Sequence, residues 1–429
     1  MITLTKSQTQ ILNQSLEILK NNNKLVITGK AGTGKTTLVK FLISELKNTI
    51  SSKSVLTVCS APTNKAVKVL KDKIGKIIDN SFFTIHSALN LKRVISPKDG
   101  SISFKPDSTS KRDPLKKVHI LIVDEASMIN KEILTEIINK SRENPEMKII
   151  FIGDEAQLPP VGEEFSAVFY SGFPCLELTE IIRQGEGNPI IDLSRDFSIL
   201  KKRKDDRREI GGYIFSNDKS SVISTLAHVN GSDTLKYLSW TNQDVDHINK
   251  LVRESIYGTP AKIELGESLI FNTPYENYFT NDEIKVMVLD IVQNPVTAYR
   301  IYNPTYNEDN KEITRFIENT KVLKYYIINN NIKIIHEDSE KVFEEMKKDM
   351  RRKCIERNAS WKDYYLFVEK FADIKYNHAI SIHKSQGSTY EKVIINIKNC
   401  MLNTDTNERN KLLYTAITRA SNLVVLYNT

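Results

Sequence analysis

Hydrophobic residues in the first half of the chain recur with two spacings, one helical and one typical of strands. Apolar positions three and four residues apart predict a helix over Ser7–Lys20, and a second helix is expected over Thr37–Leu46. Short apolar runs rich in β-branched residues predict the strands of a parallel sheet that is covered on both faces. The predicted strands are Leu25–Ile27, Val55–Val58, Ile120–Val123 and Ile149–Ile152. Helices that alternate with such strands indicate an α/β domain.

The second half of the chain repeats this pattern on both sides of a segment with a different character. Tyr237–Trp240 predicts a strand and Val245–Ile256 a helix, and the α/β pattern resumes near Asn377. Between them, residues 261–376 are expected to form an insertion made of a small β-barrel plus helices. The segments that suggest it are Ser268–Phe271, Ile284–Val292, Thr297–Tyr302 and Val322–Ile328, followed by the helical stretch Ser339–Ala372. Aromatic residues on one face of that helical stretch are interpreted as core.

A polar, turn-rich segment interrupts the first α/β pattern at residues 92–117. Arg93–Ile95 and Ile102–Phe104 have the character of two short strands. The Ser96–Gly100 turn between them predicts a β-hairpin. We therefore expect a hairpin insertion in the first domain.

Composition places the chain among ordinary globular proteins with a basic surface. Its 429 residues are 40% hydrophobic and 27% charged, and 61 basic against 53 acidic side chains give a formal net charge of +8. Such a balance suits a nucleic-acid partner but does not require one. The densest basic run, Lys201–Arg208, follows a helix predicted over Pro189–Leu200 and is interpreted as a solvated helix end or loop.

Cysteine spacing and apolar segments bear on where the protein works. The four cysteines, Cys59, Cys175, Cys354 and Cys400, are too far apart for zinc-type pairs, which indicates thiols in a reducing compartment. The first residues lack the basic-then-apolar pattern of a signal peptide, and no apolar run approaches the roughly 18 residues that span a bilayer. We expect a cytoplasmic protein, in a bacterial cell or a phage-infected host, without a membrane partner.

The strongest chemical motif is GKAGTGKT, residues Gly29–Thr36, which lies between a predicted strand and a predicted helix. It matches G-x-x-x-x-G-K-[ST], the phosphate-binding loop or P-loop. Because backbone N–H groups and the helix dipole hold phosphate oxygens in such a loop, Lys35 is expected to reach the β- and γ-phosphates of ATP, and Thr36 to ligate Mg²⁺. The candidate ATP-binding residues of this segment are Gly29, Ala31, Gly32, Thr33, Gly34, Lys35, Thr36 and Thr37.

Two further motifs follow predicted strands of the same sheet. Asp124, directly after one strand, is a candidate Mg²⁺ ligand, and Glu125 is the candidate base for the attacking water. The alternative is an exposed acidic pair at a strand end. GDEAQLPPV, Gly153–Val161, follows the next strand, and its Gln157 is a candidate to hydrogen-bond the γ-phosphate. An ordinary proline-rich turn is the alternative there.

Together with other segments, these motifs resemble the superfamily 1 helicases, and most closely their RecD/Dda-like branch. The segments that carry the resemblance are GKAGTGKT, SAPTNKAV (Ser60–Val67), TIHSAL (Thr84–Leu89), DEAS, GDEAQLPPV, LTEIIRQ (Leu178–Gln184), SIHKSQGSTYEKV (Ser381–Val393) and LLYTAITRA (Leu412–Ala420). They span nearly the whole chain, and Lys30, where relatives often have proline, departs from the pattern outside the phosphate-binding positions. The resemblance implies an ATP-dependent DNA helicase that uses ATP and Mg²⁺, moves 5′→3′ on single-stranded DNA and unwinds duplex.

The resemblance also implies an architecture: an α/β fold with two RecA-like P-loop motor domains, each a parallel sheet flanked by helices. The first motor domain would comprise residues 1–91 and 118–186 with the hairpin insertion 92–117, and the second would comprise 187–260 and 377–429 with the β-barrel-plus-helix insertion 261–376. Hydrolysis would then depend on the two domains closing on one nucleotide.

Further residues receive nucleotide-binding roles only through the resemblance. Gln8 would read the adenine edge; otherwise it is a polar residue on a helix face. Arg183 and Arg419 would approach the γ-phosphate from across the cleft, because a guanidinium is always charged and forks onto phosphate oxygens. For Arg419 the alternative is a surface arginine in a turn. Gln386 and Gly387 would lie at the same cleft.

The DNA path is expected along strand-tip loops of both motor domains. The candidate DNA-binding residues are Pro62, Thr63, Asn64, Lys65, Thr84, His86, His383, Lys384, Ser385 and Thr389. For the two histidines the alternative is a buried structural role. Trp240, Phe82 and Phe83 are either base-stacking or core residues. Phe104, on the hairpin, is the candidate wedge at a duplex fork, with a place in the hairpin's own packing as the alternative.

Two other functions compete with the helicase interpretation. One is an ATP-gated nucleic-acid clamp that binds without unwinding, against which the intact Lys35, Glu125 and Arg419 speak. The other is an RNA-directed motor of the same superfamily. The expected partners are single-stranded and forked DNA, with single-strand-binding or replication proteins as candidates, and the protein is expected to act as a monomer.

Overall fold

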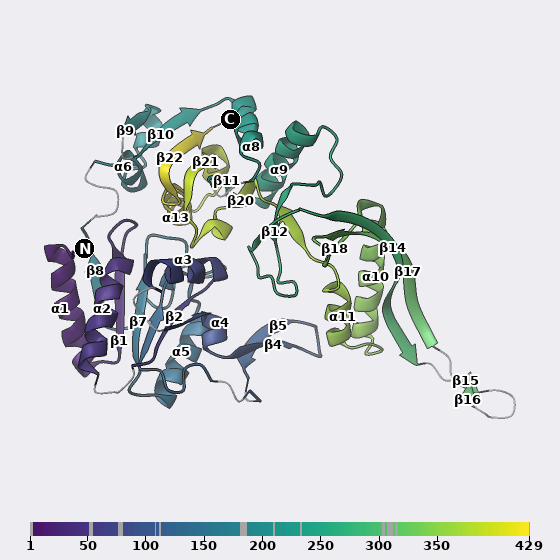
Figure 1. Cartoon of the computed structure of the whole chain (residues 1–429), viewed down its shortest axis with the longest axis horizontal. Coiled ribbons are helices and arrows are strands. Elements are labelled where there is room, and N and C mark those ends of the chain that lie inside the picture. The colour runs from purple at the N-terminus through teal and green to yellow at the C-terminus, as the bar shows by residue number, and fades with distance from the viewer. Residues whose placement is uncertain are drawn as a thin grey trace. The chain divides into compact units, whose positions relative to one another are not determined.

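The computed structural model of the chain describes residues 3–50, 55–75, 80–107, 109–110, 113–180, 187–208, 211–231, 234–302, 305–306, 312–313 and 316–428. The chain divides into two compact units (Figure 1). Unit 1 comprises Met1–Lys92, Pro106–Val252 and His378–Thr429, and unit 2 comprises Arg93–Lys105 and Arg253–Asn377.

Unit 1 contains two six-stranded sheets, the first of which carries the P-loop motif. Its strand order is β3-β2-β6-β7-β1-β8, and all neighbouring strands are parallel. The strands are β1 (Lys24–Gly29), β2 (Thr57–Ala61), β3 (Asn80–Thr84), β6 (Ile120–Val123), β7 (Lys148–Gly153) and β8 (Cys175–Leu178). The helices are α1 (Lys6–Asn21), α2 (Lys35–Thr49), α3 (Asn64–Ile74), α4 (Ile85–Ala88) and α5 (Lys131–Glu143), with the 3₁₀ turn η1 (Ala126–Met128). The described residues of unit 1 up to Glu180 are called the first lobe.

Alternate residues of this sheet face two separate cores. Ile122 is buried in a core shared with α1, α2 and α3, whereas the next residue, Val123, is buried in a core shared with α4 and α5. The predicted parallel sheet covered on both faces is therefore confirmed. Phe82 packs against the first core and Phe83 against the second, which favours the core interpretation over base stacking for both.

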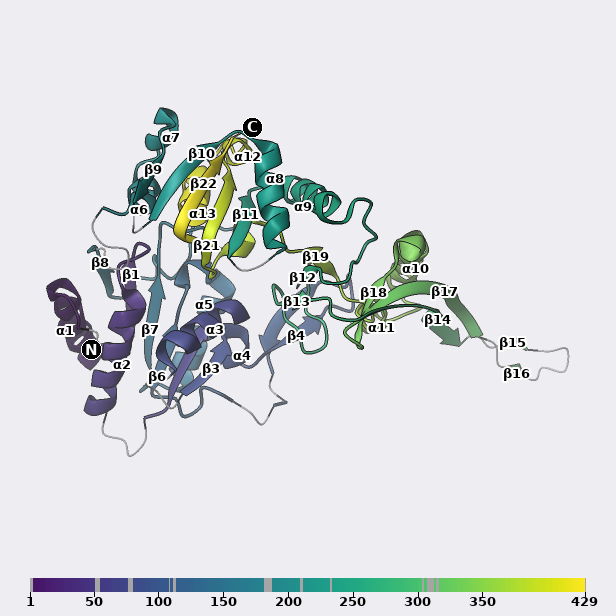
Figure 2. The same cartoon turned by 45° about the horizontal axis from the view of Figure 1, so that its top comes forward.

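The second lobe of unit 1, Gly187–Val252 and His378–Asn428, is built around the other six-stranded sheet (Figure 2). Its order is β20-β11-β21-β22-β10-β9, parallel throughout except for β9, which pairs antiparallel with β10. The strands are β9 (Asp206–Arg208), β10 (Gly211–Ser216), β11 (Leu235–Ser239), β20 (Ala379–Ser381), β21 (Tyr390–Asn396) and β22 (Ala420–Tyr427). The helices are α6 (Pro189–Arg195), α7 (Ile199–Lys202), α8 (Lys219–Val229), α9 (Asn242–Tyr257), α12 (Ile397–Met401) and α13 (Thr406–Ile417), with the 3₁₀ turn η2 (His383–Ser385). Two such sheets agree with the expected pair of RecA-like α/β domains.

The start of the second lobe differs from its sequence prediction in two places. The single helix expected over Pro189–Leu200 is divided into α6 and α7 by a turn in which Ser198 N donates to Asp196 Oδ1 at 2.9 Å. The basic run Lys201–Arg208 is not only helix end and loop, because its last three residues form β9 at the edge of the sheet. An edge strand buries few side chains, so a wholly polar sequence can form one without showing apolar alternation.

Unit 2 carries two three-stranded antiparallel sheets, of orders β13-β12-β19 and β14-β17-β18. The strands are β12 (Ser268–Phe271), β13 (Glu283–Lys285), β14 (Leu289–Tyr302), β17 (Phe316–Ile328), β18 (Ile332–Ile335) and β19 (Ile374–Tyr376), with a short pair β15 (Thr305–Tyr306) and β16 (Glu312–Ile313). Phe271 of one sheet and Ile334 of the other are buried in the same core. In the described residues, the place of the expected small β-barrel is thus taken by two sheets around one core.

Strand β14 runs through Pro295, where the sequence predicted a break. The structure pairs Pro295 with Val322 and continues the ladder on both sides of it. β14 is an edge strand in its sheet. A proline at an edge can direct its missing N–H away from the partner strand, so the ladder loses little there.

The helical stretch expected over Ser339–Ala372 consists of two helices, α10 (Glu337–Ile355) and α11 (Trp361–Val368). Arg357, with φ +63°, lies between them, and the Ser360 side chain accepts the Asp363 N–H to cap α11. The predicted aromatic face is core for the most part: Trp361 and Phe371 are buried, and Tyr364 and Val368 pack against the same core as Phe371. Neither α10 nor any other helix in the described ranges is long and apolar enough to cross a membrane.

Candidate functional site

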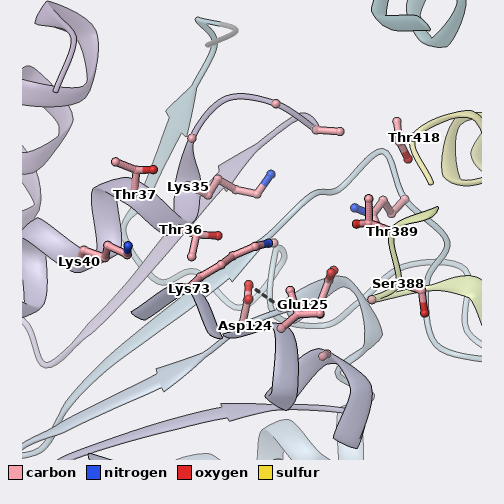
Figure 3. A pocket seen from close by; sticks show the side chains of 18 of the residues that line it. Lys35, Thr36, Thr37, Lys40, Lys73, Asp124, Glu125, Ser388, Thr389 and Thr418 are labelled. Carbon is pink, nitrogen blue, oxygen red and sulfur yellow. Dashed lines mark hydrogen bonds between the residues drawn. The ribbon is translucent and has the colours of Figure 1, made fainter. Parts of the chain in front are cut away.

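A cavity of about 380 Å³ in unit 1 is lined by residues from both lobes (Figure 3). The first lobe contributes Thr3, Gln8, Ala31, Gly32, Gly34, Lys35, Thr36, Thr37, Lys40, Ala66, Val69, Lys73, Asp124, Glu125, Gly153 and Gln157. The second lobe contributes Gly387, Ser388, Thr389, Thr418 and Arg419. The cavity therefore brings together residues of six sequence motifs and the helix α1, which are far apart in the chain.

The P-loop turns directly from β1 into α2 at the wall of this cavity. Gly32 and Gly34 have φ values of +86° and +76°, which side chains rarely adopt, so glycine suits both positions. Helix α2 starts at Lys35, and no side chain of the described residues caps its first turn. The N–H groups of that turn and the helix dipole therefore favour an anion. Lys35 Nζ donates to the carbonyl oxygen of Lys30 at 3.0 Å and also to that of Gly29, which holds the ammonium group over the loop.

Two predicted ATP-binding residues shape the P-loop without lining the cavity. A Cβ at Gly29 would lie 2.8 Å from the Leu178 carbonyl oxygen, so this position has room only for glycine. Thr33 is 1% exposed, and its hydroxyl donates to the Lys30 carbonyl at 2.9 Å. Both residues set the course of the backbone that surrounds the cavity.

Two carboxylates occupy the carboxyl end of β6. Burial and the neighbouring Glu125 carboxylate raise the pKa of Asp124 to about 6, against the lowering effects of the Glu125 N–H and of Lys35 and Lys73. Glu125 has φ +53°, a left-handed conformation that is unusual for a residue with a side chain and is concentrated at functional sites. Its side chain extends into the cavity beside Asp124 (Figure 3). A desolvated carboxylate next to a strained acidic residue has the chemistry of a metal ligand beside a base.

The oxygen ligands at this place fit Mg²⁺. Thr36 offers a hydroxyl and Asp124 a carboxylate to the same cavity. In the described part of the chain no group of three or more His, Cys, Asp or Glu residues could hold a metal. Magnesium commonly takes one or two protein ligands and completes its shell with water and substrate phosphates, so a sparse donor set agrees with it.

Two lysines at the cavity were not singled out from the sequence. Lys40 lies on α2 and Lys73 on α3, and the Lys73 side chain extends toward Asp124 and Glu125 (Figure 3). Lys73 follows Ala66 and Val69 at helical spacing, and all three line the cavity. The helical spacing of these three residues could be seen in the sequence. Without the direction of α3, however, the sequence does not show that this helix face lies beside the P-loop.

Two glutamines predicted to contact the nucleotide line the cavity, and they differ in their hydrogen bonds. Gln8 is 2% exposed, and its Nε2 donates to the carbonyl oxygens of Thr33 and Gly34 at 3.4 Å each. Gln157 is 6% exposed, and its Oε1 has no hydrogen-bond partner among the described residues. A buried amide oxygen without a partner costs free energy, so Gln157 is the better placed of the two to meet a ligand or a water there.

Arg419 and Gly387 bring the second lobe to the cavity. The Arg419 side chain is 5% exposed, and its guanidinium donates to the carbonyl oxygens of Thr415 at 3.1 Å and Ser388 at 3.0 Å. A Cβ at Gly387 would lie 3.1 Å from the Ala66 Cβ, so glycine permits close approach of the lobes. A fixed positive charge thus lies in the wall opposite the P-loop.

Two other predicted nucleotide contacts are not at the cavity wall. Gln386 is 5% exposed and does not line the cavity; its Nε2 donates to the Leu158 carbonyl at 2.9 Å. Arg183 lies outside the described residues. Of the predicted arginine pair, the cavity therefore includes Arg419.

The candidate DNA-binding residues fall on loops after β2, β3 and β20. Thr63 and Thr84 are the N-caps of α3 and α4, Pro62, Asn64 and Lys65 surround the first cap, and His383, Lys384 and Ser385 form η2. Ser385 is fully buried, and its hydroxyl donates to the Ile382 carbonyl at 2.7 Å, so it supports the turn. Thr389 lines the cavity described above. The remaining candidates lie at strand tips, where loops of RecA-like sheets commonly carry binding residues.

Both candidate histidines sit where burial lowers the pKa. Burial lowers the pKa of His86, and it also lowers that of His383 against the opposing effect of Glu408. Each imidazole is therefore neutral at pH 7, and any contact with a phosphate would use one ring N–H rather than a positive charge. Among the candidate DNA-binding residues the positive charge comes from Lys384, next to His383 in the chain, and from Lys65, whose Nζ lies 5.1 Å from the centre of the Tyr390 ring.

The predicted hairpin is present as β4 (Leu91–Ile95) and β5 (Ile102–Pro106). Phe104 is 50% exposed on β5, which is exposed at every residue. Within unit 2 the turn of the hairpin contacts α11. A Cβ at Gly100 would lie 2.4 Å from the Trp361 ring, and Tyr365 Oη donates to the Gly100 carbonyl at 2.8 Å. The Arg93 guanidinium lies 4.5 Å from the Tyr365 ring centre and pairs with Glu369.

Comparison with known proteins finds family matches for both the N-terminal and the C-terminal motifs. The family described as "AAA domain" matches residues 13–163, and the "UvrD-like helicase C-terminal domain" matches residues 376–427. The ATP-dependent DNA helicase Dda of Enterobacteria phage T4 is 28% identical, over 97% of this chain and 97% of its own length. A protein called R530 of Acanthamoeba polyphaga mimivirus is 29% identical, over 95% of this chain and 96% of its own length.

A solved structure agrees on the fold. A Pif1 helicase, from a study of DNA unwinding at forked double-stranded DNA by two coordinating Pif1 helicases, is 19% identical with a TM-score of 0.50. The match covers 99% of this chain and 92% of that one. RecD subunits and other Pif1 helicases are further relatives in sequence. In sequence the chain is therefore similar, over nearly its whole length, to superfamily 1B helicases of the Dda, RecD and Pif1 type.

Proposed function

We propose that this protein is a motor that moves 5′→3′ along single-stranded DNA and unwinds duplex DNA, with ATP hydrolysed in the cavity between its two lobes. The observation that carries the proposal is the composition of that cavity. P-loop residues of the first lobe and Arg419 of the second lobe line the same space. A cavity divided in this way makes hydrolysis depend on how the two lobes approach each other.

Hydrolysis in this cavity needs positioning and charge rather than a covalent enzyme intermediate. The N–H groups at the start of α2 and Lys35 would bind the phosphates. Thr36 and Asp124 would hold Mg²⁺, which when bound neutralises developing charge on the phosphate oxygens. Glu125 would accept a proton from the attacking water, and Arg419 would stabilise charge on the transferred group from the second lobe.

Movement along DNA would follow from changes in the affinity of each lobe for the strand. The candidate strand-tip residues of the first lobe, Thr63 to Lys65, belong to the N-terminal part of α3, whose later residues Val69 and Lys73 line the cavity. In the second lobe, His383 and Lys384 precede Gly387 by a few residues. Each DNA loop is therefore close in sequence to a cavity residue, and a change at the nucleotide can alter the affinity of each lobe for the strand.

Phe104 on the hairpin is the proposed wedge. Its half-exposed ring can stack on a terminal base pair, which is worth about 1–3 kcal/mol per base. The contacts of the hairpin turn with α11 would keep the wedge in position under load.

The test is an unwinding assay on duplexes with either a 5′ or a 3′ single-stranded tail. We expect the wild-type protein to open only the 5′-tailed duplex. Lys35→Ala should abolish opening, since the phosphate-binding ammonium is lost. The control is Lys47→Ala in the last turn of the same helix, outside the cavity, which should open duplex like the wild type.

Other outcomes would replace the proposal. Equal opening of 3′-tailed DNA would remove the direction of travel. ATP turnover stimulated by single strands without any strand separation would make the protein a clamp or a translocase. A parallel RNA duplex opened faster than DNA would reassign the substrate.

A further inference from the structure

The loop Gly153–Val161, called the DEAQ loop here, is bound by three groups of the second lobe. Leu158 N donates to Thr415 Oγ1 at 3.1 Å, and Gln386 Nε2 donates to the Leu158 carbonyl at 2.9 Å. The third contact is the Tyr414 hydroxyl, which donates to Asp154 Oδ2 at 2.6 Å. One short loop of the first lobe is thus hydrogen-bonded to both α13 and the SIHKSQG segment, Ser381–Gly387.

The Tyr414 hydroxyl makes a second contact, with the P-loop. Ala31 N–H donates to Tyr414 Oη at 2.8 Å. Since the oxygen accepts this bond, its own proton is directed to Asp154, and the phenol is donor and acceptor at once. Tyr414 is 4% exposed and Asp154 2% exposed. Two hydrogen bonds on one oxygen, one buried and one part-buried, join the P-loop, the DEAQ loop and α13.

Asp154 also accepts two hydrogen bonds from the part of the DEAQ loop that carries Gln157. Asp154 Oδ1 accepts the Ala156 N–H at 3.1 Å, and the Asp154 carbonyl accepts the Gln157 N–H at 3.1 Å. Burial, then the adjacent Asp154, raises the pKa of Tyr414, so the phenol keeps its proton throughout the physiological range. The position of Gln157 at the cavity is in this way connected to the position of α13.

We propose that Tyr414 is a positioning residue that couples the DNA-binding segment of the second lobe to the P-loop. The connection runs from the SIHKSQG segment through Gln386 to the DEAQ loop, from Asp154 to the Tyr414 hydroxyl, and from there to Ala31. Movement of the second lobe on DNA would therefore shift the P-loop and Gln157 together. This proposal rests on the function proposed above, because it assigns the route by which DNA changes ATP turnover.

Tyr414→Phe tests the proposal, since it removes the oxygen and retains the ring. Tyr237→Phe is a matched control: Tyr237 is a fully buried tyrosine of the second lobe whose hydroxyl donates to Asp244 at 3.0 Å, away from the cavity. Both variants lose a hydrogen bond to an aspartate, and Tyr414→Phe also loses the one from the Ala31 N–H. Its thermal stability should therefore fall somewhat more than that of Tyr237→Phe.

Two readouts separate coupling from mere stability. In hydrogen–deuterium exchange of the whole protein, Tyr414→Phe should speed exchange in peptides that cover Ala31 and Asp154–Leu158, and Tyr237→Phe should not. In ATPase assays, the ratio of turnover with and without single-stranded DNA should fall about tenfold in Tyr414→Phe, within the 5–150-fold range typical of coupling between sites. The same ratio should stay at the wild-type value in Tyr237→Phe.

The outcomes decide the two proposals separately. If Tyr414→Phe exchanges like the wild type, or keeps its DNA stimulation within about twofold, the coupling role is rejected. If Tyr237→Phe loses stimulation equally, the effect is one of stability and the role is also rejected. If the wild type itself shows no DNA-stimulated turnover, the proposed function is rejected, and the exchange readout still decides whether Tyr414 joins the two loops.

Discussion

The nucleotide cavity and the hairpin of unit 2 fix their key side chains in different ways. In the cavity, Lys35 of the P-loop is the first residue of a helix, and Asp124 directly follows a buried strand. At the hairpin, Phe104 lies on an exposed strand, and the turn is held by Trp361 and by a hydrogen bond that joins residues 265 positions apart. Local chain geometry places Lys35 and Asp124, although the cavity around them gathers motifs that are far apart in the chain. At the hairpin, contacts distant in sequence hold the turn itself.

This difference predicts how the two regions respond to substitution. A change in a cavity side chain should stop chemistry and leave the fold intact, because the backbone there is set by glycines and buried strands. A change at the contact of the hairpin with α11 should leave ATP turnover intact and reduce strand separation. The following substitutions test that division, beginning with the largest expected effect.

Glu125→Gln should lower DNA-stimulated ATP turnover by about 10³-fold, since removal of a general base commonly costs 10²–10⁴. Binding of a fluorescent ATP analogue should remain within a few-fold of the wild type, because the P-loop is untouched. Glu132→Gln, at an exposed position in the first turn of α5, is the control and should turn over normally. A Glu125→Gln variant with turnover within tenfold of the wild type would move the base elsewhere.

Gly100→Ala should separate unwinding from ATP turnover. An added Cβ would lie 2.4 Å from the Trp361 ring, and overpacking of this kind costs about 1–3 kcal/mol. We expect roughly tenfold slower unwinding with ATP turnover unchanged, because a free-energy cost of 1.4 kcal/mol corresponds to a factor of ten. The control is Gly172→Ala, whose φ of +75° matches the +73° of Gly100 but whose Cβ would meet nothing within 4 Å. Equal losses in both variants would attribute the effect to backbone strain alone.

Lys73→Ala should change the pH dependence of the cavity more than its maximal rate. Lys73 lowers the pKa of Asp124, which burial and Glu125 raise to about 6, so loss of its charge should raise that pKa further. The proposed Mg²⁺ ligand is the ionised form, so kcat/KM for ATP should fall as the pH drops through about 6 in the wild type. In Lys73→Ala the acid limb should move to higher pH. Lys71→Ala, exposed on the same helix and outside the cavity, should leave the limb in place. An unshifted limb in Lys73→Ala would show that this lysine acts on something other than Asp124.

The sequence predicted best those elements whose pattern is local. Buried strands such as Ile120–Val123 have the bounds expected, because a continuous β-branched run has few other stable conformations in a covered sheet. The P-loop could be placed because its glycines and the following helix are consecutive in the chain. Strand β9 escaped prediction because an edge strand can be wholly polar. Strand β14 was predicted as two pieces rather than one, because its edge position tolerates Pro295.

The candidate site was predictable only as far as motifs reach. To predict Lys73 at the cavity, one would have to know the direction of α3. To predict the two hydrogen bonds of Tyr414, one would have to know how the two lobes approach each other. Local sequence spacing gives neither. The burial of Trp361 was predicted, but its contact with Gly100 in the hairpin turn was not. Contacts between segments far apart in sequence are the common physical reason for these omissions.

Tyr365→Phe is the mildest test of the comparison. It removes the hydroxyl that donates to the Gly100 carbonyl at 2.8 Å and keeps the ring that stacks with Arg93. A single hydrogen bond of this kind contributes about 1 kcal/mol, so unwinding should slow by roughly two- to fivefold while ATP turnover remains unchanged. Tyr364→Phe, which alters the neighbouring tyrosine of the same helix, should have no effect on either rate. If Tyr365→Phe lowered ATP turnover as well, the hairpin contact would influence the nucleotide cavity, and the division between locally and remotely fixed sites would not hold for function.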